Sequence, residues 1–420
     1  MIRQISILLL VIVVVWGLGC TAKRDTDQSR INENLIVRST QSPAGVDSRE
    51  PDMNATPDGR IVMSWVEKIG EKRYALRTAI RDANGWSETR TVSEGDNWFI
   101  NWADFPSVIA LRDGSLAAHW LVKSGTSTYA YDVNIARSSD GGKTWTNPIV
   151  PHTDKTQTEH GFVSLLPLPD GRAGAVWLDG RNLKDMKQED EHAPATESMT
   201  LRYAAIDADG KVSDEAQLDE RVCECCQTAA TLTSEGAIAV YRDRSDSEVR
   251  DIYTVRNSNG TWTSPKPVHA DDWKISGCPV NGPSIAADNR RVVVAWYTQA
   301  GDRARVRLAF SEDAGATFGQ PVIVDDHQAV GRVDVLLLPD GSALVCWLAG
   351  TVEAGEIKVR RIATDGTLGP ISSIAKTDIS RSSGFPRMAR LGNTVHFAWT
   401  EFGKPSYVKT AEADVSAFSQ

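Results

Sequence analysis

A short apolar strand that ends in an aromatic residue recurs seven times along this chain, and no other feature constrains its fold as strongly. Three of the copies read PDGRIVMSW, PDGRAGAVW and PDGSALVCW. The seven aromatic residues are Trp65, Trp120, Trp177, Tyr241, Trp296, Trp347 and Trp399. Their spacing of roughly 50 to 65 residues is typical of the blades of a β-propeller.

Each aromatic residue is followed by a run of alternating polar and apolar residues, such as YALRTAI or RVRLAFS, and then by a turn and a further short strand. Alternation with a period of two is a strand signal, so each repeat contains four strands. The predicted fold is therefore all-β, with one β-propeller domain of four-stranded antiparallel blades over residues 35–420. We predict seven blades, with six as the alternative. The segment NLIVRST, residues 34–40, would complete the last blade and close the ring.

Two turns share one pattern, SSDGGKTW at residues 138–145 and SEDAGATF at residues 311–318. In the first, Ser138 and Asp140 are expected to bond the turn's own backbone, Gly142 to supply a positive φ and Trp145 to anchor the turn. The second copy has Ser311, Asp313, Gly315 and Phe318 in the same places. With this motif the chain resembles the Asp-box, or BNR-repeat, propellers of the sialidase type. The resemblance implies that these acidic residues are structural.

The strand order predicts which face of the propeller carries function. The PDG turns and the Asp-boxes lie on one face, and the long, charged loops lie on the other, around the axis. Arginine binds carboxylates through two parallel hydrogen bonds, so the arginines of the loop-rich face suit an acidic sugar. The alternative is that they tie neighbouring blades together. The ligand-binding candidates are Arg242, Asp243, Arg244, Asp179, Arg181, Arg332, Arg387 and Glu401.

The resemblance to sialidases implies an exo-acting glycoside hydrolase on sialic acid or another acidic sugar. That family uses three arginines, a Tyr–Glu pair and an acidic Asp, but its Arg-Ile-Pro element is absent, and GFPR at 384–387 does not match it. Tyr407 is a counterpart of the nucleophile by position only, so no catalytic residue is assigned. The alternative function is non-catalytic binding of a glycan or a protein in the cell envelope.

Four cysteines form a second candidate site. Cys223, Cys225 and Cys226 lie in VCECCQTA, and Cys278 lies in ISGCPVNG. Each stretch opens the inner strand of a neighbouring blade, so the two should lie close together. They predict either disulfides or a thiolate site for copper(I) or zinc, with His160 as a further ligand. A cysteine-based, metal-handling protein is the third functional reading.

The first twenty residues read as a secretory signal, with MIRQ as the charged region and ISILLLVIVVVW as the apolar region. GLGC, which follows it, resembles the end of a bacterial lipoprotein signal, and this implies that Cys20 is lipidated. The alternative is an uncleaved membrane anchor, although the apolar run is short for a full span. Residues 21–34 are predicted to be a polar tether.

These features predict an exported protein anchored to a membrane of the bacterial cell envelope. The net charge of -9 and a pI of about 5.4 argue against nucleic acid as a partner, because binding phosphates requires a basic face.

Overall fold

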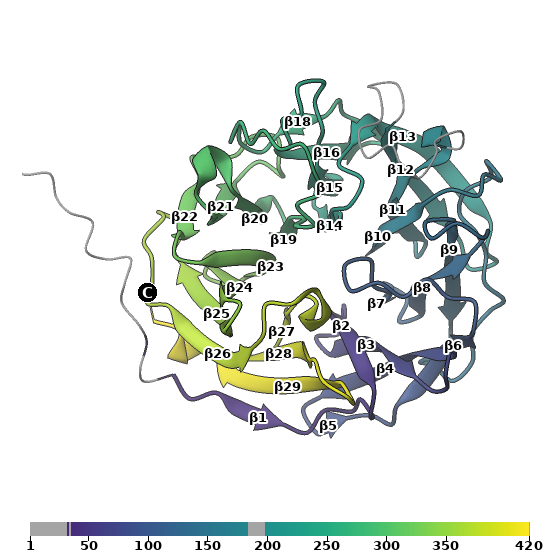
Figure 1. Ribbon diagram of the computed structural model, residues 1–420, viewed down its shortest axis with the longest axis horizontal. Helices are drawn as coiled ribbons and strands as arrows, with labels where there is room; N and C mark the ends of the chain where they lie inside the picture. The colour runs from purple at the N-terminus through teal and green to yellow at the C-terminus, as the bar shows by residue number, and fades with distance from the viewer. Residues whose placement is uncertain (1–31, 33–34, 184–197, 420) are drawn as a thin grey trace, which may run out of the picture.

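A computed structural model describes residue 32 and residues 35–183 and 198–419. Seven antiparallel sheets are arranged in a ring around one axis (Figure 1). This confirms the prediction of an all-β, seven-bladed propeller, and the six-bladed alternative is wrong. The helical residues of the described chain form four 3-10 turns, Arg181–Leu183, Ala300–Asp302, Arg381–Ser383 and Val415–Ala417.

In every blade three consecutive strands follow each other from the axis outward. The first blade contains β2 (Ser48–Ala55), β3 (Ile61–Lys68), β4 (Tyr74–Asp82) and β6 (Arg90–Gly95), with β5 (Gly85–Trp86) beside β4. The second contains β7 (Ser107–Ala110), β8 (Leu116–Lys123) and β9 (Tyr131–Ser138). Its fourth strand is reduced to a single bridge between Ile135 and Ile149. The third contains β10 (His160–Pro167), β11 (Ala173–Asp179), β12 (Met199–Ile206) and β13 (Val212–Val222).

The remaining four blades repeat this order. The fourth contains β14 (Ala229–Thr233), β15 (Gly236–Arg242), β16 (Ile252–Ser258) and β18 (Lys266–Pro267), with β17 (Thr261–Trp262) beside β16. The fifth contains β19 (Ser284–Asp288), β20 (Arg291–Thr298), β21 (Arg305–Ser311) and β22 (Val322–Asp325). The sixth contains β23 (Ala329–Leu337), β24 (Ala343–Thr351), β25 (Ala354–Ile362) and β26 (Ser372–Thr377). The seventh contains β27 (Arg387–Leu391), β28 (Thr394–Glu401), β29 (Tyr407–Asp414) and β1 (Arg38–Thr40).

Both ends of the propeller domain meet in the seventh blade. β1 pairs antiparallel with β29, so Arg38 lies opposite Glu412 and Thr40 lies opposite Thr410. The outer strand of the last blade therefore comes from the beginning of the domain (Figure 1). This confirms that NLIVRST closes the ring, and pairing of this kind leaves the outer edge of β29 covered.

The recurring tryptophan has one structural role in four blades. Trp65, Trp177, Trp296 and Trp347 are at most 2% exposed and pack in the apolar clusters between sheets. Their indole N–H groups donate to carboxylates near the loop-rich face, from Glu67, Asp179, Asp271 and Asp325 respectively. A large apolar ring with one polar atom suits this position, because the ring fills the core while the N–H keeps a partner.

Both Asp-box turns are held by their own side chains. Asp140 accepts hydrogen bonds from the Thr144 N–H at 2.9 Å and the Thr144 hydroxyl at 2.7 Å, and Ser138 accepts one from the Gly142 N–H at 2.8 Å. Gly142 has a φ of +83°, which glycine adopts without steric cost. The second turn repeats these bonds at Ser311, Asp313, Gly315 and Thr317. Trp145 and Phe318 pack at the edges of neighbouring apolar clusters.

The leader of residues 1–20, its Cys20 and nearly all of the tether lie outside the described residues, so these remain predictions. Within the described part of the chain, no helix is long and apolar enough to cross a membrane.

Candidate functional site

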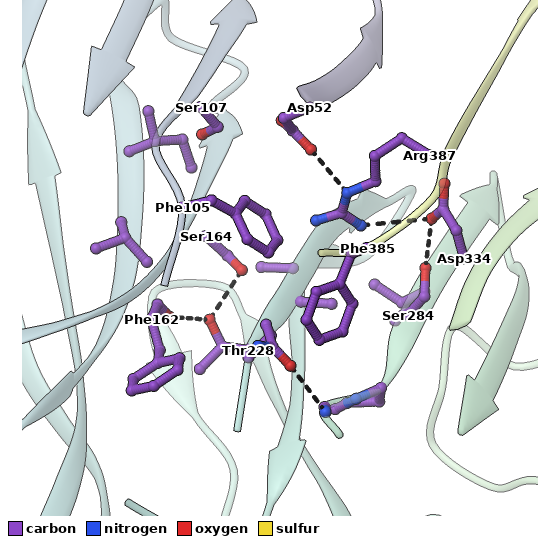
Figure 2. A pocket seen from close by; sticks show the side chains of 18 of the residues that line it. Asp52, Phe105, Ser107, Phe162, Ser164, Thr228, Ser284, Asp334, Phe385 and Arg387 are labelled. Atoms are coloured by element: carbon purple, nitrogen blue, oxygen red, sulfur yellow. Dashed lines mark hydrogen bonds and ion pairs between the residues drawn. The ribbon is translucent and has the colours of Figure 1, made fainter. Parts of the chain in front are cut away.

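A pocket of about 150 Å³ lies on the propeller axis and is lined by the inner strands of all seven blades. Polar side chains from every blade line it, and seven of them, one from each blade, surround the axis. These are Asp52, Ser107, Ser164, Thr228, Ser284, Asp334 and Arg387, which we call the axial ring. Figure 2 shows the seven side chains around the cavity.

The sequence repeat determines where the residues of the axial ring lie in their strands. Six of its members, all except Thr228, lie opposite the residue that immediately precedes the recurring aromatic residue on the next strand. In β2, β10 and β23 a bulge precedes the ring residue, and Glu50, Phe162 and Arg332 adopt a positive φ there. A bulge re-aims the side chains that follow it.

Proline directly precedes four of the ring residues, in the sequences EPD, FPS, GPS and FPR. Three of these residues, Ser107, Ser284 and Arg387, are the first of their strands. The first residue of a strand tolerates a preceding proline because the missing N–H is not needed for the ladder.

Arg387 is the centre of the charged half of the ring. Its Nε lies 3.2 Å from Asp52 Oδ1, and its Nη1 lies 3.7 Å from Asp334 Oδ1. Ser284 donates to Asp334 Oδ1 at 3.0 Å. The guanidinium lies 4.7 Å from the ring centre of Phe105, and Figure 2 shows Phe105 and Phe385 beside it. This half of the ring thus holds two carboxylates, one cation and two aromatic faces.

The other half of the ring is neutral. The hydroxyls of Ser164 and Thr228 are 2.8 Å apart, and Thr228 donates to the carbonyl of Phe162 at 2.7 Å. Ser107 pairs with His119 at 3.0 Å. The pocket therefore offers hydroxyl donors and acceptors on one side and charged groups on the other.

Burial changes the acidity of two carboxyl groups that line the pocket. It raises the pKa of Asp334, against the lowering effect of Arg387 and two hydrogen bonds. It also raises the pKa of Asp104 to about 7, although the Phe162 N–H and the Tyr131 hydroxyl donate to this carboxyl group. A pKa near 7 allows the Asp104 carboxyl group to supply a proton near neutral pH.

Tyr131 lies between two acidic side chains, one of which is Asp104 of the pocket lining. It was not among the residues predicted from the sequence. The Tyr131 hydroxyl is 2.9 Å from Asp104 Oδ2 and 2.7 Å from Glu159 Oε1. Tyr131 is fully buried and stacks on Phe99 with ring centres 3.9 Å apart. Burial raises the pKa of Glu159 to about 8. Because Tyr131 has no access to solvent, this Tyr–Glu pair does not face a substrate site.

The predicted cluster at the end of β15 lies away from the axial pocket and is bound to protein groups. Arg242 is 1% exposed and donates to the carbonyls of Arg250, Asn281 and Tyr297 at 2.6 to 3.1 Å. Its guanidinium also lies 4.8 Å from the ring centre of Trp273. It therefore joins the fourth blade to the fifth.

The neighbours of Arg242 also have partners. Arg244 forms ion pairs with Glu224 and Glu248. Burial raises the pKa of Asp243 to about 7, and the charge of Asp219 adds to this effect.

The other predicted residues are distributed around the loop-rich face. Arg332 donates to Ser383 and to the carbonyls of Ile379, Ser380 and Gly384, and it lies 4.6 Å from the ring centre of Trp102. Arg181 holds the fully buried Asp179 with two hydrogen bonds at 2.6 and 2.7 Å.

Two further residues from the sequence analysis, Glu401 and Tyr407, lie at the turn between β28 and β29. Glu401 is exposed and lies 3.3 Å from Lys409, and Tyr407 lies opposite it in the register. Of the eight predicted ligand-binding residues, only Arg387 lines the axial pocket.

His160 belongs to a buried charge network and not to the cysteine cluster. Its ring stacks on His152 with centres 3.8 Å apart. Nδ1 lies 3.5 Å from Asp132, and Nε2 lies 3.3 Å from Asp154 and 3.8 Å from Asp179. Burial alone would lower the pKa of His160, but the hydrogen bonds to Asp132 and Asp154 and the charge of Asp179 raise it to about 9. The donor atoms of His160 lie within 4.8 Å of those of Asp132 and His152 on one side and of Asp154 and Asp179 on the other.

The raised pKa predicts a pH dependence of stability. A group whose pKa is about 6.5 in the unfolded chain and about 9 in the folded chain stabilises the fold fully below pH 6.5, and this contribution is lost as the pH rises through 9. We expect the free energy of unfolding to fall by about 3 kcal/mol more over this range in the native protein than in His160→Gln. Urea unfolding at pH 6.5 and pH 9 measures the difference. His327→Gln is the control, since His327 is 69% exposed, and equal slopes for all three proteins would contradict the prediction.

The cysteines meet on the loop-rich face, in two blade-connecting loops and not within the inner strands themselves. The sulfur of Cys223 lies 3.8 Å from that of Cys225 and 3.5 Å from that of Cys226. Burial raises the pKa of Cys225, and hydrogen bonds with the neighbouring thiols, including Cys278, add to the effect. All five described cysteines are free thiols.

The fold and the axial ring define a seven-bladed propeller with its pocket on the axis. A family model described as "BNR repeat-like domain" matches residues 70–397, and the chain belongs to this family. A search of curated proteins finds no match.

Solved structures share the fold at low sequence identity. The polysaccharide lyase Uly1 superposes with a TM-score of 0.53 and 8% identity, over 90% of this chain and 91% of the lyase. The α-L-arabinanase of Penicillium chrysogenum, solved with arabinobiose, gives 0.51 and 11%, over 92% of this chain and 99% of the enzyme. The intramolecular trans-sialidase of Ruminococcus gnavus gives 0.49 and 12%, over 77% and 98%. The first two similarities support the fold alone.

Proposed function

We propose that the protein recognises a sugar unit of a glycan at the axial pocket. The observation that carries the proposal is the axial ring, in which every blade contributes at least one polar side chain to the same cavity. Carboxylates accept hydrogen bonds from sugar hydroxyls, and serine, threonine and arginine donate to sugar oxygens. The neighbouring rings of Phe105 and Phe385 offer apolar faces to the carbons of a sugar.

The size of the pocket determines how such a ligand would bind. A cavity of about 150 Å³ is smaller than the ~300–1,000 Å³ of typical small-molecule sites. One edge of a single sugar unit would therefore enter the ring, and the rest of the glycan would lie over the loop-rich face. An acidic sugar has one cation available in the ring, Arg387, which Asp52 and Asp334 already flank.

Hydrolysis of the bound glycan is the second candidate function, and the two carboxyl groups beside Arg387 favour it. Glycoside hydrolysis requires a carboxylic acid that donates a proton and a carboxylate that assists attack. The raised pKa of Asp334 suits the acid, and Asp52 lies on the opposite side of the guanidinium.

Binding to an array of glycans, followed by calorimetry, tests the proposal. We expect Arg387→Ala to weaken binding by about 1.5–3 kcal/mol, or roughly 10- to 100-fold, because it removes a charged donor. Sialyllactose and lactose form a matched pair that separates acidic from neutral recognition. Asp334→Asn should abolish any release of sugar while retaining binding if the second candidate is correct.

The control is Arg303→Ala, which removes a guanidinium that is 65% exposed on the surface. Arg303→Ala should bind as the native protein does. A second variant, Arg387→Lys, should confirm that the loss of binding in Arg387→Ala is not a loss of folding. Undiminished binding by Arg387→Ala, or no binding to any glycan of the array, would contradict the proposed site.

A further inference from the structure

We propose that Cys223, Cys225 and Cys226 form a three-thiolate site for one copper(I) ion on the loop-rich face. They lie in the loop between β13 and β14, and their three sulfur atoms all lie within 4.8 Å of one another. This site is separate from the axial ring, and the proposal does not depend on glycan binding.

The sulfur spacing suits a trigonal site. A metal–sulfur distance of about 2.3 Å places three ligands of one ion about 4 Å apart. The sulfur of Cys223 lies 3.8 Å from that of Cys225 and 3.5 Å from that of Cys226, and both distances are within a few tenths of an ångström of this value. Metal binding therefore requires only a small outward movement of the sulfur atoms.

The number of ligands favours copper(I) over zinc. Structural zinc is almost always held by four ligands in a tetrahedron, whereas the described donors that all lie within 4.8 Å of one another are three cysteines. Cys278 is close to Cys225 but lies outside this group. Thiolates are soft ligands that select copper(I). A carboxylate-preferring ion such as calcium or magnesium is excluded by the same chemistry.

Arginine side chains offset the charge of the site. One copper(I) ion and three thiolates have a net charge of -2, which is costly to bury without cations. Arg250 Nη1 lies 3.3 Å from the sulfur of Cys223, and Arg250 also pairs with Glu248 at 2.8 Å. Arg250 therefore supplies a positive charge directly beside the proposed ligands.

The exposure of the four thiols indicates a route for the ion. Cys223 and Cys226 are at most 1% exposed, Cys225 is half-buried, and Cys278 is exposed on the next blade-connecting loop. Copper(I) replaces the protons of the thiols when it binds. Cys278 could accept the ion first and transfer it to Cys225 by exchange of one thiolate for another, with no change in oxidation state.

Anaerobic titration of the reduced protein with copper(I), against a coloured copper(I) chelator, tests the site. We expect one copper(I) ion per chain and an X-ray absorption spectrum with sulfur neighbours only. Cys226→Ser should bind more than roughly 100-fold more weakly, because loss of a ligand exceeds the ~10–100-fold effect of losing an outer-shell partner. Cys346→Ala is the matched control, since it removes a buried thiol from the core of the sixth blade and should bind copper(I) normally.

Three results would overturn the proposal. The first is unchanged affinity in Cys226→Ser with normal folding by circular dichroism. The second is tighter retention of zinc than of copper(I) in direct competition. The third is a Cys223–Cys226 disulfide in the purified protein that, once reduced, still binds no copper(I). Cys278→Ser should keep the stoichiometry but slow the uptake of the ion, which distinguishes an entry ligand from a fourth member of the site.

Discussion

Replacing Arg242 with alanine is expected to lower the free energy of unfolding by about 3–5 kcal/mol. The guanidinium is fully buried and donates four hydrogen bonds to three backbone carbonyls, two of which belong to the next blade or the loop that leads to it. Alanine removes all four bonds and leaves the carbonyls without donors in a region closed to water. Urea unfolding followed by tryptophan fluorescence measures the change.

Arg303→Ala is the control for this prediction, because its exposed ion pair with Asp326 is expected to contribute less than about 1 kcal/mol. Lysine at position 242 should recover only part of the loss, since one ammonium group does not span three carbonyls. An Arg242→Ala protein of native stability that no longer binds a glycan would instead support the ligand-binding role predicted from the sequence.

Removing β1 should have a comparable effect on stability. We compare a chain that begins at residue 41 with one that begins at residue 32. The shorter chain loses the pairing of β1 with β29 and the packing of Leu35 and Val37 against the cluster that contains Phe418. Partial loss of two apolar side chains and several ladder hydrogen bonds predicts a decrease of about 3–5 kcal/mol in the free energy of unfolding.

The exposed edge of β29 adds a second readout for this prediction. An unpaired strand edge invites pairing with another chain, so the shorter protein should elute from a sizing column in part as dimers and larger species. Arg38→Ala in the longer chain is the control, because it removes only exposed ion pairs with Glu412 and Asp414. Equal stability and a single monomer peak for both chains would show that β1 does not close the ring.

The fold was predictable because its determinants are local and repeated. The recurring aromatic residue and the alternating runs occupy the same place in every copy, and the two Asp-box turns occupy the same place in theirs, so the repeat reports the blade number directly. NLIVRST was recognisable as the closing strand because the last repeat lacked one. None of these inferences requires knowledge of which residues meet across the ring.

The axial ring was not predicted, although its sequence signal is present. Four of the seven ring residues follow proline, in EPD, FPS, GPS and FPR, and six lie opposite the residue before the recurring aromatic one. Aligning the inner strands on the recurring aromatic residue identifies six of the seven. The prediction from charged loops included Arg387 because of its charge, but it did not include the serines and the threonine of the ring.

The sequence by itself determined the blade number, the strand order, the closing strand and the proximity of the cysteines, because each depends on spacing along the chain. Only the tertiary structure decided which arginines are bound to backbone carbonyls and which line the cavity. Arg242 and Arg332 are as charged as Arg387 in the sequence, yet their guanidiniums are bound to backbone carbonyls of neighbouring loops, while Arg387 lies in the cavity. Closure of the ring brings loops from distant repeats together, and the carbonyls that they present determine whether a cation stabilises the fold or remains available to a ligand.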